Sequence, residues 1–340
     1  MALSYREVLS AKVDHLIFPL VGASEVICII DPPDHPNVGD QAIFLGELSF
    51  LKRNFPNSEV FFYDLRNYSE SAEKYIEKAS VLLIHGGGNF GDIWPHHHEM
   101  RKRTLERFSH KRIVQLPQSI SFTDQMEVQE TARLIRAQSS FTLLVRDAKA
   151  LKFAQEHFEC ASILCPDMAF AMDRIERKEP STDVFCLLRT DKEVVADHVS
   201  LLKCLNADMI KYISDDWLEE PMTRIKNLDR RLSQVTRKRP WLTYPVRRLM
   251  LNIRQRYAEE RLAWGISLLS KGEIVVTDRL HAHILSCLMG IPNIALDSWD
   301  GKVAALYEAW TGHGFQCEMA SSHADVIKRV HDLRMRSRNA

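Results

Sequence analysis

The sequence has no apolar stretch near the length of about 20 residues that a membrane-spanning helix needs. Its first ten residues are polar and mixed, unlike a secretory signal. It also lacks an excess of either charge, because 45 Lys and Arg balance 45 Asp and Glu, so no overall field attracts nucleic acid. From these absences we expect a soluble, cytoplasmic protein with no nucleic-acid partner.

The 7 cysteines include no Cys-x-x-Cys pair, which removes a common pattern of zinc and redox sites. Some lie in apolar runs, such as Cys28 in Val-Ile-Cys-Ile-Ile, and we interpret them as buried thiols in a reducing compartment. The remaining composition is that of a globular chain, with 45% hydrophobic and 26% charged residues. A length of 340 residues suits two domains.

Short apolar runs alternate with helical patterns in the first half of the chain. The runs predict strands at 25–30, 60–63, 81–84, 112–116, 141–145 and 162–164. Helical spacing of apolar residues predicts helices at 40–55 and 147–156. This alternation is typical of a parallel sheet covered by helices on both faces.

A polar stretch at 173–182 interrupts the pattern and is interpreted as an interdomain linker. A second α/β unit follows, with predicted strands at 184–188, 209–213, 274–277 and 293–296 and helices at 192–205, 282–289 and 324–335. We therefore expect an α/β protein with one Rossmann-like domain over 1–173 and a second over 174–340.

Residues 224–261 differ from the rest, with 12 Lys or Arg against three Asp or Glu. One interpretation is a pair of solvated helices. The other is a basic surface that faces a phosphate-bearing acceptor or the anionic lipid of the inner membrane face. No interleaved aromatic pattern accompanies the charge, which disfavours nucleic acid.

Ligands of open α/β sheets bind beyond the carboxyl ends of the strands, so polar residues at those ends are the strongest candidates for ligand contacts. Asn37 and Asp40 follow the first strand and open a helix. Either side chain can cap that helix, and its N-terminus can bind an anion. A plain N-cap turn and a ligand-facing loop are both consistent with this pattern.

A glycine-rich run, His85-Gly86-Gly87-Gly88-Asn89, directly follows the third strand. Such glycines let backbone N–H groups approach a ligand closely. With Gly91 the run matches the G-x-G-x-x-G pattern of dinucleotide sites. The next strand leads into Pro117-Gln118 without the acidic residue that holds a ribose. A phosphate or carboxylate cradle and a tight turn without a ligand remain as alternatives.

Three adjacent histidines, at 96–98, suggest a metal site. Adjacent residues of a helix point about 100° apart and rarely bind one ion, so we expect no metal. Arg101 and Arg103 just beyond are candidate anion contacts.

The most specific cluster is Asp278-Arg279-Leu280-His281, at a strand-to-helix junction. Arg suits bidentate binding of phosphate or carboxylate, and His suits proton transfer near neutral pH. Arg146 and Arg189 also end strands, where each forms a surface salt bridge or a ligand contact. Lys302 closes a polar loop at 297–302.

Taken in order, seven motifs resemble the polysaccharide pyruvyl transferase family. They are 37–40 (Asn-Val-Gly-Asp), 85–89 (His-Gly-Gly-Gly-Asn), 115–119 (Gln-Leu-Pro-Gln-Ser), 145–147 (Val-Arg-Asp), 165–167 (Cys-Pro-Asp), 278–281 (Asp-Arg-Leu-His) and the loop at 297–302. The resemblance runs from about residue 30 to 310. Where the family has Asp-Asn-Ser-Tyr before Gly-Lys, this chain has Asp-Ser-Trp-Asp at 297–300, which leaves the details of this loop open.

The resemblance implies two domains arranged as in GT-B glycosyltransferases, with an interdomain cleft. It also implies transfer of a pyruvyl group from phosphoenolpyruvate to a hexose of a lipid-linked oligosaccharide or exopolysaccharide repeat, forming a ketal and releasing phosphate. The family's expected donor-binding and catalytic positions are Arg279 and His281.

From these positions a site is hypothesised. His281 is a general acid or base, Arg279 and either Arg189 or Arg146 bind the donor anion, and Asp40 contacts the acceptor. Further expected substrate-binding residues are Asn37, Gly86, Gly87, Gly88, Asn89, Gln118, Asp278 and Lys302. We expect no cofactor, since arginines can neutralise the donor.

Three other functions share parts of this pattern. A nucleotide-sugar glycosyltransferase would share the architecture, and a non-catalytic carbohydrate-binding protein would not need both Arg279 and His281. An NAD-dependent oxidoreductase is supported only by the glycine match.

Overall fold

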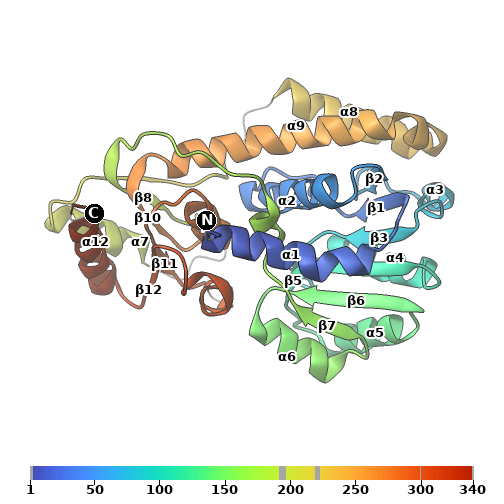
Figure 1. Ribbon diagram of the computed structural model, residues 1–340, viewed down its shortest axis with the longest axis horizontal. Helices are drawn as coiled ribbons and strands as arrows, with labels where there is room; N and C mark the ends of the chain where they lie inside the picture. Colours follow the sequence, from blue (N-terminus) through green and yellow to red (C-terminus); the bar gives the residue numbers. More distant parts are fainter. Residues whose placement is uncertain (1–2, 191–196, 219–222, 299, 339–340) are drawn as a thin grey trace.

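The computed structural model describes residues 3–190, 197–218, 223–298 and 300–338, and it contains two parallel sheets (Figure 1). The first sheet has seven strands in the order β2-β1-β3-β5-β6-β7, with β4 beside β5. Their bounds are β1 Val26–Ile30, β2 Glu59–Tyr63, β3 Val81–Ile84, β4 Gly87–Phe90, β5 Arg112–Ile120, β6 Ser140–Val145 and β7 Ala161–Leu164. All pairings are parallel, as expected for strands joined through helices.

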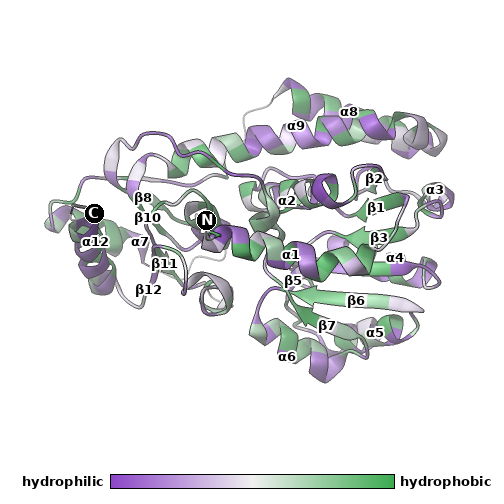
Figure 2. Ribbon diagram, viewed as in Figure 1, coloured by the Kyte–Doolittle hydropathy of each residue, from purple (hydrophilic) through white to green (hydrophobic). Residues whose placement is uncertain are grey.

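The second sheet has five parallel strands in the order β12-β11-β10-β8-β9. Their bounds are β8 Thr182–Leu187, β9 Tyr212–Asp215, β10 Gly272–Thr277, β11 Asn293–Leu296 and β12 Cys317–Ala320. The central strands are buried on both faces and coloured mainly as hydrophobic in Figure 2, which is why they read as continuous apolar runs. The predicted α/β fold with two parallel sheets is confirmed.

One predicted strand is displaced. The apolar run predicted a strand at 209–213, whereas β9 begins at Tyr212. Met209 has a positive φ of 54°, directly after α7 (His198–Ala207). A left-handed turn there ends the helix and delays the strand. Residues 192–196 of the helix predicted at 192–205 lie outside the described residues.

The other predicted helices agree with the structure to within a few residues: α2 Val38–Asn54, α6 Ala148–His157, α10 Leu280–Leu288 and α12 His323–Arg338. The sequence analysis missed several helices, namely α1 Tyr5–Val21, α3 Glu73–Ile76, α4 Pro95–Arg107, α5 Gln125–Arg136 and α11 Lys302–Leu306. No helix of the described residues is long and apolar enough to span a bilayer.

The basic segment forms a helical pair, α8 (Arg224–Lys238) and α9 (Thr243–Leu269), which follows the linker in sequence. It runs along the outside of the first sheet's layer (Figure 1), where α9 packs on α2 and β2. The approach is close, because a Cβ added at Gly265 would lie 2.4 Å from Val38. α1 also joins the two halves, since the Tyr5 hydroxyl donates to the Trp310 carbonyl at 2.7 Å.

Candidate active site

A cavity of about 560 Å³ lies between the carboxyl ends of the two sheets, the expected place for a ligand. Its walls come from the loops after β1, β3 and β6 of the first sheet and after β8, β9 and β10 of the second. Ten residues expected from the sequence line it: Asn37, Asp40, Gly86, Gly88, Asn89, Arg146, Arg189, Arg279, His281 and Lys302. The other three, Gly87, Gln118 and Asp278, lie behind the described lining.

His281 stands at the first turn of α10 and touches the start of α2. A Cβ added at Gly39 would lie only 2.4 Å from the Nδ1 atom of His281, so only glycine allows this approach. The Nε2 atom of His281 lies 3.5 Å from the carboxylate of Asp167. The two halves of the chain thus meet at this imidazole.

Asp167 links His281 to Arg146. The Arg146 Nη1 atom donates to Asp167 at 2.7 Å and its Nε atom donates to Ser119 at 2.9 Å. Burial alone would raise the pKa of Asp167, but His281 and Arg146 hold it well below its ordinary value. The carboxylate therefore stays ionised and orients a cavity-lining arginine and histidine together.

Arg279 is held by a residue that sequence analysis missed. Its Nε and Nη2 atoms each donate to Asp216 at 2.7 Å, a bidentate pair that fixes the plane of the guanidinium. Asp216 follows β9, and it also accepts hydrogen bonds from the backbone N–H and hydroxyl of Thr190. Because the strand was predicted at 209–213, whereas β9 ends at Asp215, Asp216 was not recognised as a strand-end residue.

Asp278 lies behind the cavity and supports its wall. It accepts the backbone N–H of Arg189 at 2.9 Å and contacts the Nε2 atom of His198 at 2.9 Å. This placement fits an orienting residue.

The side chains of Gln118 and Arg101 support the glycine loop from the side away from the cavity. The Gln118 side chain donates to the His85 carbonyl and to the Asn89 Oδ1 atom, both at 2.9 Å. Arg101 donates to the same Oδ1 at 2.6 Å. Gly88 lies under Arg146, because an added Cβ would be 3.4 Å from its Nη2 atom. Residues 87–89 of the glycine-rich run thus belong to strand β4, and this strand lies next to the guanidinium of Arg146.

Asp40 sits among imidazoles on the opposite wall. Its carboxylate is 3.6 Å from the Nε2 atom of His35. Burial would raise the pKa of Asp40, but the charges of His35, His281, His85 and Arg146 lower it below its ordinary value. An ionised carboxylate can accept hydrogen bonds from hydroxyl groups.

A carboxylate–imidazole pair, Asp31 with His97, lines the same wall and was missed by the sequence analysis. The Nδ1 atom of His97 lies 2.8 Å from Asp31. Burial lowers the pKa of His97, but the hydrogen bond and charge of Asp31 raise it above its ordinary value. Asp31 has a φ of +62°, a strained conformation that is often found at functional sites. The position of Asp31 directly after strand β1 was the feature of the sequence that could have identified it as a site residue.

The neighbouring histidines point elsewhere, as expected for adjacent helix positions. His96 is exposed, whereas His98 is buried beside Phe122 and contacts Thr131 at 3.2 Å. The three histidines therefore do not converge on one point.

Comparison with known proteins identifies the family. The profile of the polysaccharide pyruvyl transferase family matches residues 37–300. The chain belongs to this family. It is 30% identical over 324 residues to pyruvyl transferase 1 of Schizosaccharomyces pombe, covering 90% of this chain and 75% of that protein. General stress protein 30 of Bacillus subtilis is 26% identical, covering 86% of this chain and 79% of the relative.

A solved structure shares the fold. A functionally uncharacterised protein of Klebsiella pneumoniae superposes with a TM-score of 0.61 at 16% identity, covering 92% of this chain and 99% of that one. At this identity the likeness concerns the fold alone.

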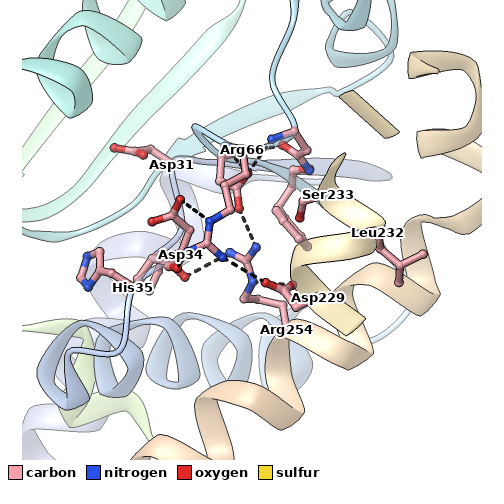
Figure 3. A network of polar contacts seen from close by, with 12 residues as sticks. Asp31, Asp34, His35, Arg66, Asp229, Leu232, Ser233 and Arg254 are labelled. Atoms are coloured by element: carbon pink, nitrogen blue, oxygen red, sulfur yellow. Dashed lines mark hydrogen bonds and ion pairs between the residues drawn. The ribbon is translucent and has the colours of Figure 1, made fainter. Parts of the chain in front are cut away.

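In this pyruvyl transferase family member, four consecutive carbonyls of the loop after β1 are held from behind. Arg254 donates to Pro33 at 3.0 Å, Gln41 to His35 at 2.7 Å and Arg261 to Pro36 at 2.9 Å. The fourth carbonyl, of residue 34, accepts from the guanidinium of residue 66. Six residues of loop 31–37 line the cavity, while four of the loop's carbonyls are held by side chains from outside the loop, among them Arg66 and Arg254 (Figure 3).

Arg254 and Arg261 belong to α9, from the far half of the sequence. Arg254 also forms ion pairs with Asp64 at 2.6 Å and with Asp229 of α8 at 2.9 Å (Figure 3). All three side chains of this cluster are buried. The basic segment is therefore not merely a solvated helical pair, because part of its charge is used inside the protein to shape the cavity wall.

Among the described residues, one group of side chains has the composition of a metal site: His283, Cys287 and Cys317. Both ring nitrogens of His283 are already hydrogen-bonded, to Asn293 at 2.6 Å and Thr311 at 2.7 Å. The group also lies outside the cavity lining. His283 is thus part of a buried polar network.

Proposed function

We propose that the protein transfers the pyruvyl group of phosphoenolpyruvate to a hexose of a lipid-linked oligosaccharide or exopolysaccharide repeat, in a GT-B-like arrangement. The proposal rests on one observation, which is that two parts of the same cavity present different chemical groups. Four cations line it, from both sheets: Arg146, Arg189, Arg279 and Lys302. The wall after β1 instead offers carboxylates, imidazoles and an amide.

The cationic part suits the donor. Phosphoenolpyruvate carries a phosphate and a carboxylate, and fixed guanidinium groups bind such anions bidentately. Asp216 and Asp167 fix the planes of Arg279 and Arg146 before the donor arrives, which lowers the cost of ordering them.

The other wall suits a sugar. Asp31 and Asp40 supply carboxylates, His35 and His97 supply imidazoles, and the exposed Trp94 supplies an aromatic face. Few polar groups set among aromatic surface are typical of small-ligand sites. His281 lies where the two walls meet, near Asp167 on one side and Asp40 on the other.

The chemistry follows from this placement. Protonation of the methylene carbon of phosphoenolpyruvate by His281 leaves an oxocarbenium-like carbon, which an acceptor hydroxyl attacks while Asp40 receives the hydroxyl proton. Phosphate then leaves with its bridging oxygen, and a second hydroxyl of the same sugar attacks the oxocarbenium-like carbon that remains and closes the cyclic ketal, its proton passing to His281 and restoring the imidazolium. The arginines stabilise the anionic donor and the departing phosphate.

Ligand-dependent thermal stability tests the donor. A ligand that binds only the folded state stabilises it by about 2.7 kcal/mol at one hundred times its Kd. We expect phosphoenolpyruvate to raise the melting temperature of the wild type and not of Arg279→Ala. The matched control Arg133→Ala removes an exposed arginine of α5 and should respond as the wild type.

Two outcomes would contradict the proposal. A rise with a UDP-sugar but none with phosphoenolpyruvate would favour glycosyl transfer. Near wild-type turnover in a folded His281→Ala variant would remove the assigned proton donor.

A further inference from the structure

The helix α8 has an unusual distribution of side chains. Its buried face is polar and consists of Lys226, Asp229, Ser233 and Thr236, which recur at helical spacing. Its apolar residues face outward instead, with Leu228 47% and Val235 43% exposed. Since a surface helix normally buries its apolar stripe, this inversion marks a surface that something else covers.

The buried polar face explains why α8 stays attached. Asp229 joins the ion pairs of Arg254 and contacts Arg66 at 3.7 Å. Figure 3 shows Asp229 and Ser233 on the side of α8 that faces this network, with Leu232 directed away from it. The polar face therefore anchors α8 to the protein, while Leu228 and Val235 stay on the solvent side.

The outward face is also strongly cationic. It carries Arg224, Arg231 and Lys238, and Arg237 and Arg239 are exposed at the C-terminal end of the helix. None of these five cations forms an ion pair within the described part of the chain. Asp229 is the sole acid between residues 223 and 258, and it is buried. Trp241, 60% exposed, follows at the turn into α9.

We propose that α8 and the turn at Trp241 dock on an anionic phospholipid surface. Cations interleaved with Leu, Val and Trp are typical of helices that lie in a membrane interface, where Trp is favoured. The positive charge complements anionic headgroups, and the outward apolar groups insert below them. A nucleic-acid surface would use the charge but leave the apolar residues in water. The inference does not depend on the proposed reaction.

Flotation of the full-length protein with vesicles tests the proposal. The wild type should bind vesicles that contain phosphatidylglycerol and not vesicles of phosphatidylcholine alone. Arg231→Glu with Lys238→Glu should weaken binding by at least about twenty-five-fold, since each cation near the surface contributes about five-fold. The control Arg133→Glu with Lys152→Glu makes the same charge change on α5 and α6, at side chains 63% and 78% exposed, and should bind as the wild type.

A second variant separates lipid from other polyanions. Leu228→Ser with Val235→Ser leaves the charge unchanged and should still weaken vesicle binding at least several-fold. Equal loss in the control charge variant, unchanged binding of the serine variant, or binding to duplex DNA without binding to anionic vesicles would each overturn the proposal. Melting temperatures of all variants establish that they are folded.

Discussion

Gly39→Ala is the substitution that tests the assembled site most directly. The added Cβ would lie 2.4 Å from Nδ1, 2.5 Å from Cγ and 2.7 Å from Cβ of His281. Rotation of the imidazole cannot relieve the last contact, because the Cβ of His281 is fixed to the backbone. Carbon atoms pack at about 3.5–4.0 Å, so the start of α2 or α10 must move by at least about 0.8 Å.

Such a displacement predicts a large loss of activity with little loss of stability. A misplacement of about 1 Å can reduce a rate by about 100-fold, equivalent to about 2.7 kcal/mol in the barrier. The higher helix propensity of Ala offsets part of the strain by up to about 1 kcal/mol. We expect kcat for phosphate release from phosphoenolpyruvate with acceptor to fall about 100-fold while the melting temperature changes by a few degrees.

Gly290→Ala provides the matched control. Gly290 follows α10 with a φ of +67°, and nothing lies within 4 Å of an added Cβ. This variant should lose about 1 kcal/mol of stability from backbone strain and keep its kcat. A Gly39→Ala enzyme with kcat within three-fold of wild type would refute the claim that close contact between α2 and α10 positions His281.

Three further predictions concern the buried charges. Asp167→Asn should destabilise the fold by about 3–5 kcal/mol in urea unfolding, because it leaves the Arg146 guanidinium buried without its partner; a loss under 1 kcal/mol would contradict this. The raised pKa of His97 means that its pairing with Asp31 stabilises the fold below about pH 6.5 and is lost as pH rises through the folded-state pKa. Asp31→Asn should therefore destabilise more at pH 6 than at pH 9, and equal losses at both would argue against the pair. Arg254→Gln should raise the KM for the acceptor more than that for phosphoenolpyruvate, since it releases the loop after β1; equal changes would indicate a purely structural role.

Local patterns in the sequence were sufficient to predict most of the strands and several of the strand-end motifs, although β4 and β12 were missed and β9 was displaced. Strands such as Val81–Ile84 are buried on both faces of a parallel sheet, so they are recognisable in the sequence as continuous apolar runs. Arg279 and His281 were found because a strand end followed by a helix is visible locally. The order of the motifs also indicated the family, which the family match confirms.

The partners of those residues depend on the tertiary structure. Asp216 and Asp167 lie in separate loops and His97 lies on α4, and only the order of the strands and the meeting of two sheets brings them to the residues that line one cavity. Local spacing also could not show that Gln118 supports the glycine loop from behind.

The basic segment shows most clearly which properties follow from the sequence alone and which depend on tertiary packing. Its composition determined that residues 224–261 are charged and helical, but not which charges are used inside. Packing of α9 on α2 buries Arg254 against Asp64, 190 residues away, and leaves cations of α8 such as Arg231 and Lys238 outside. A charge is retained inside only where an opposite charge meets it, and that meeting depends on how distant segments pack.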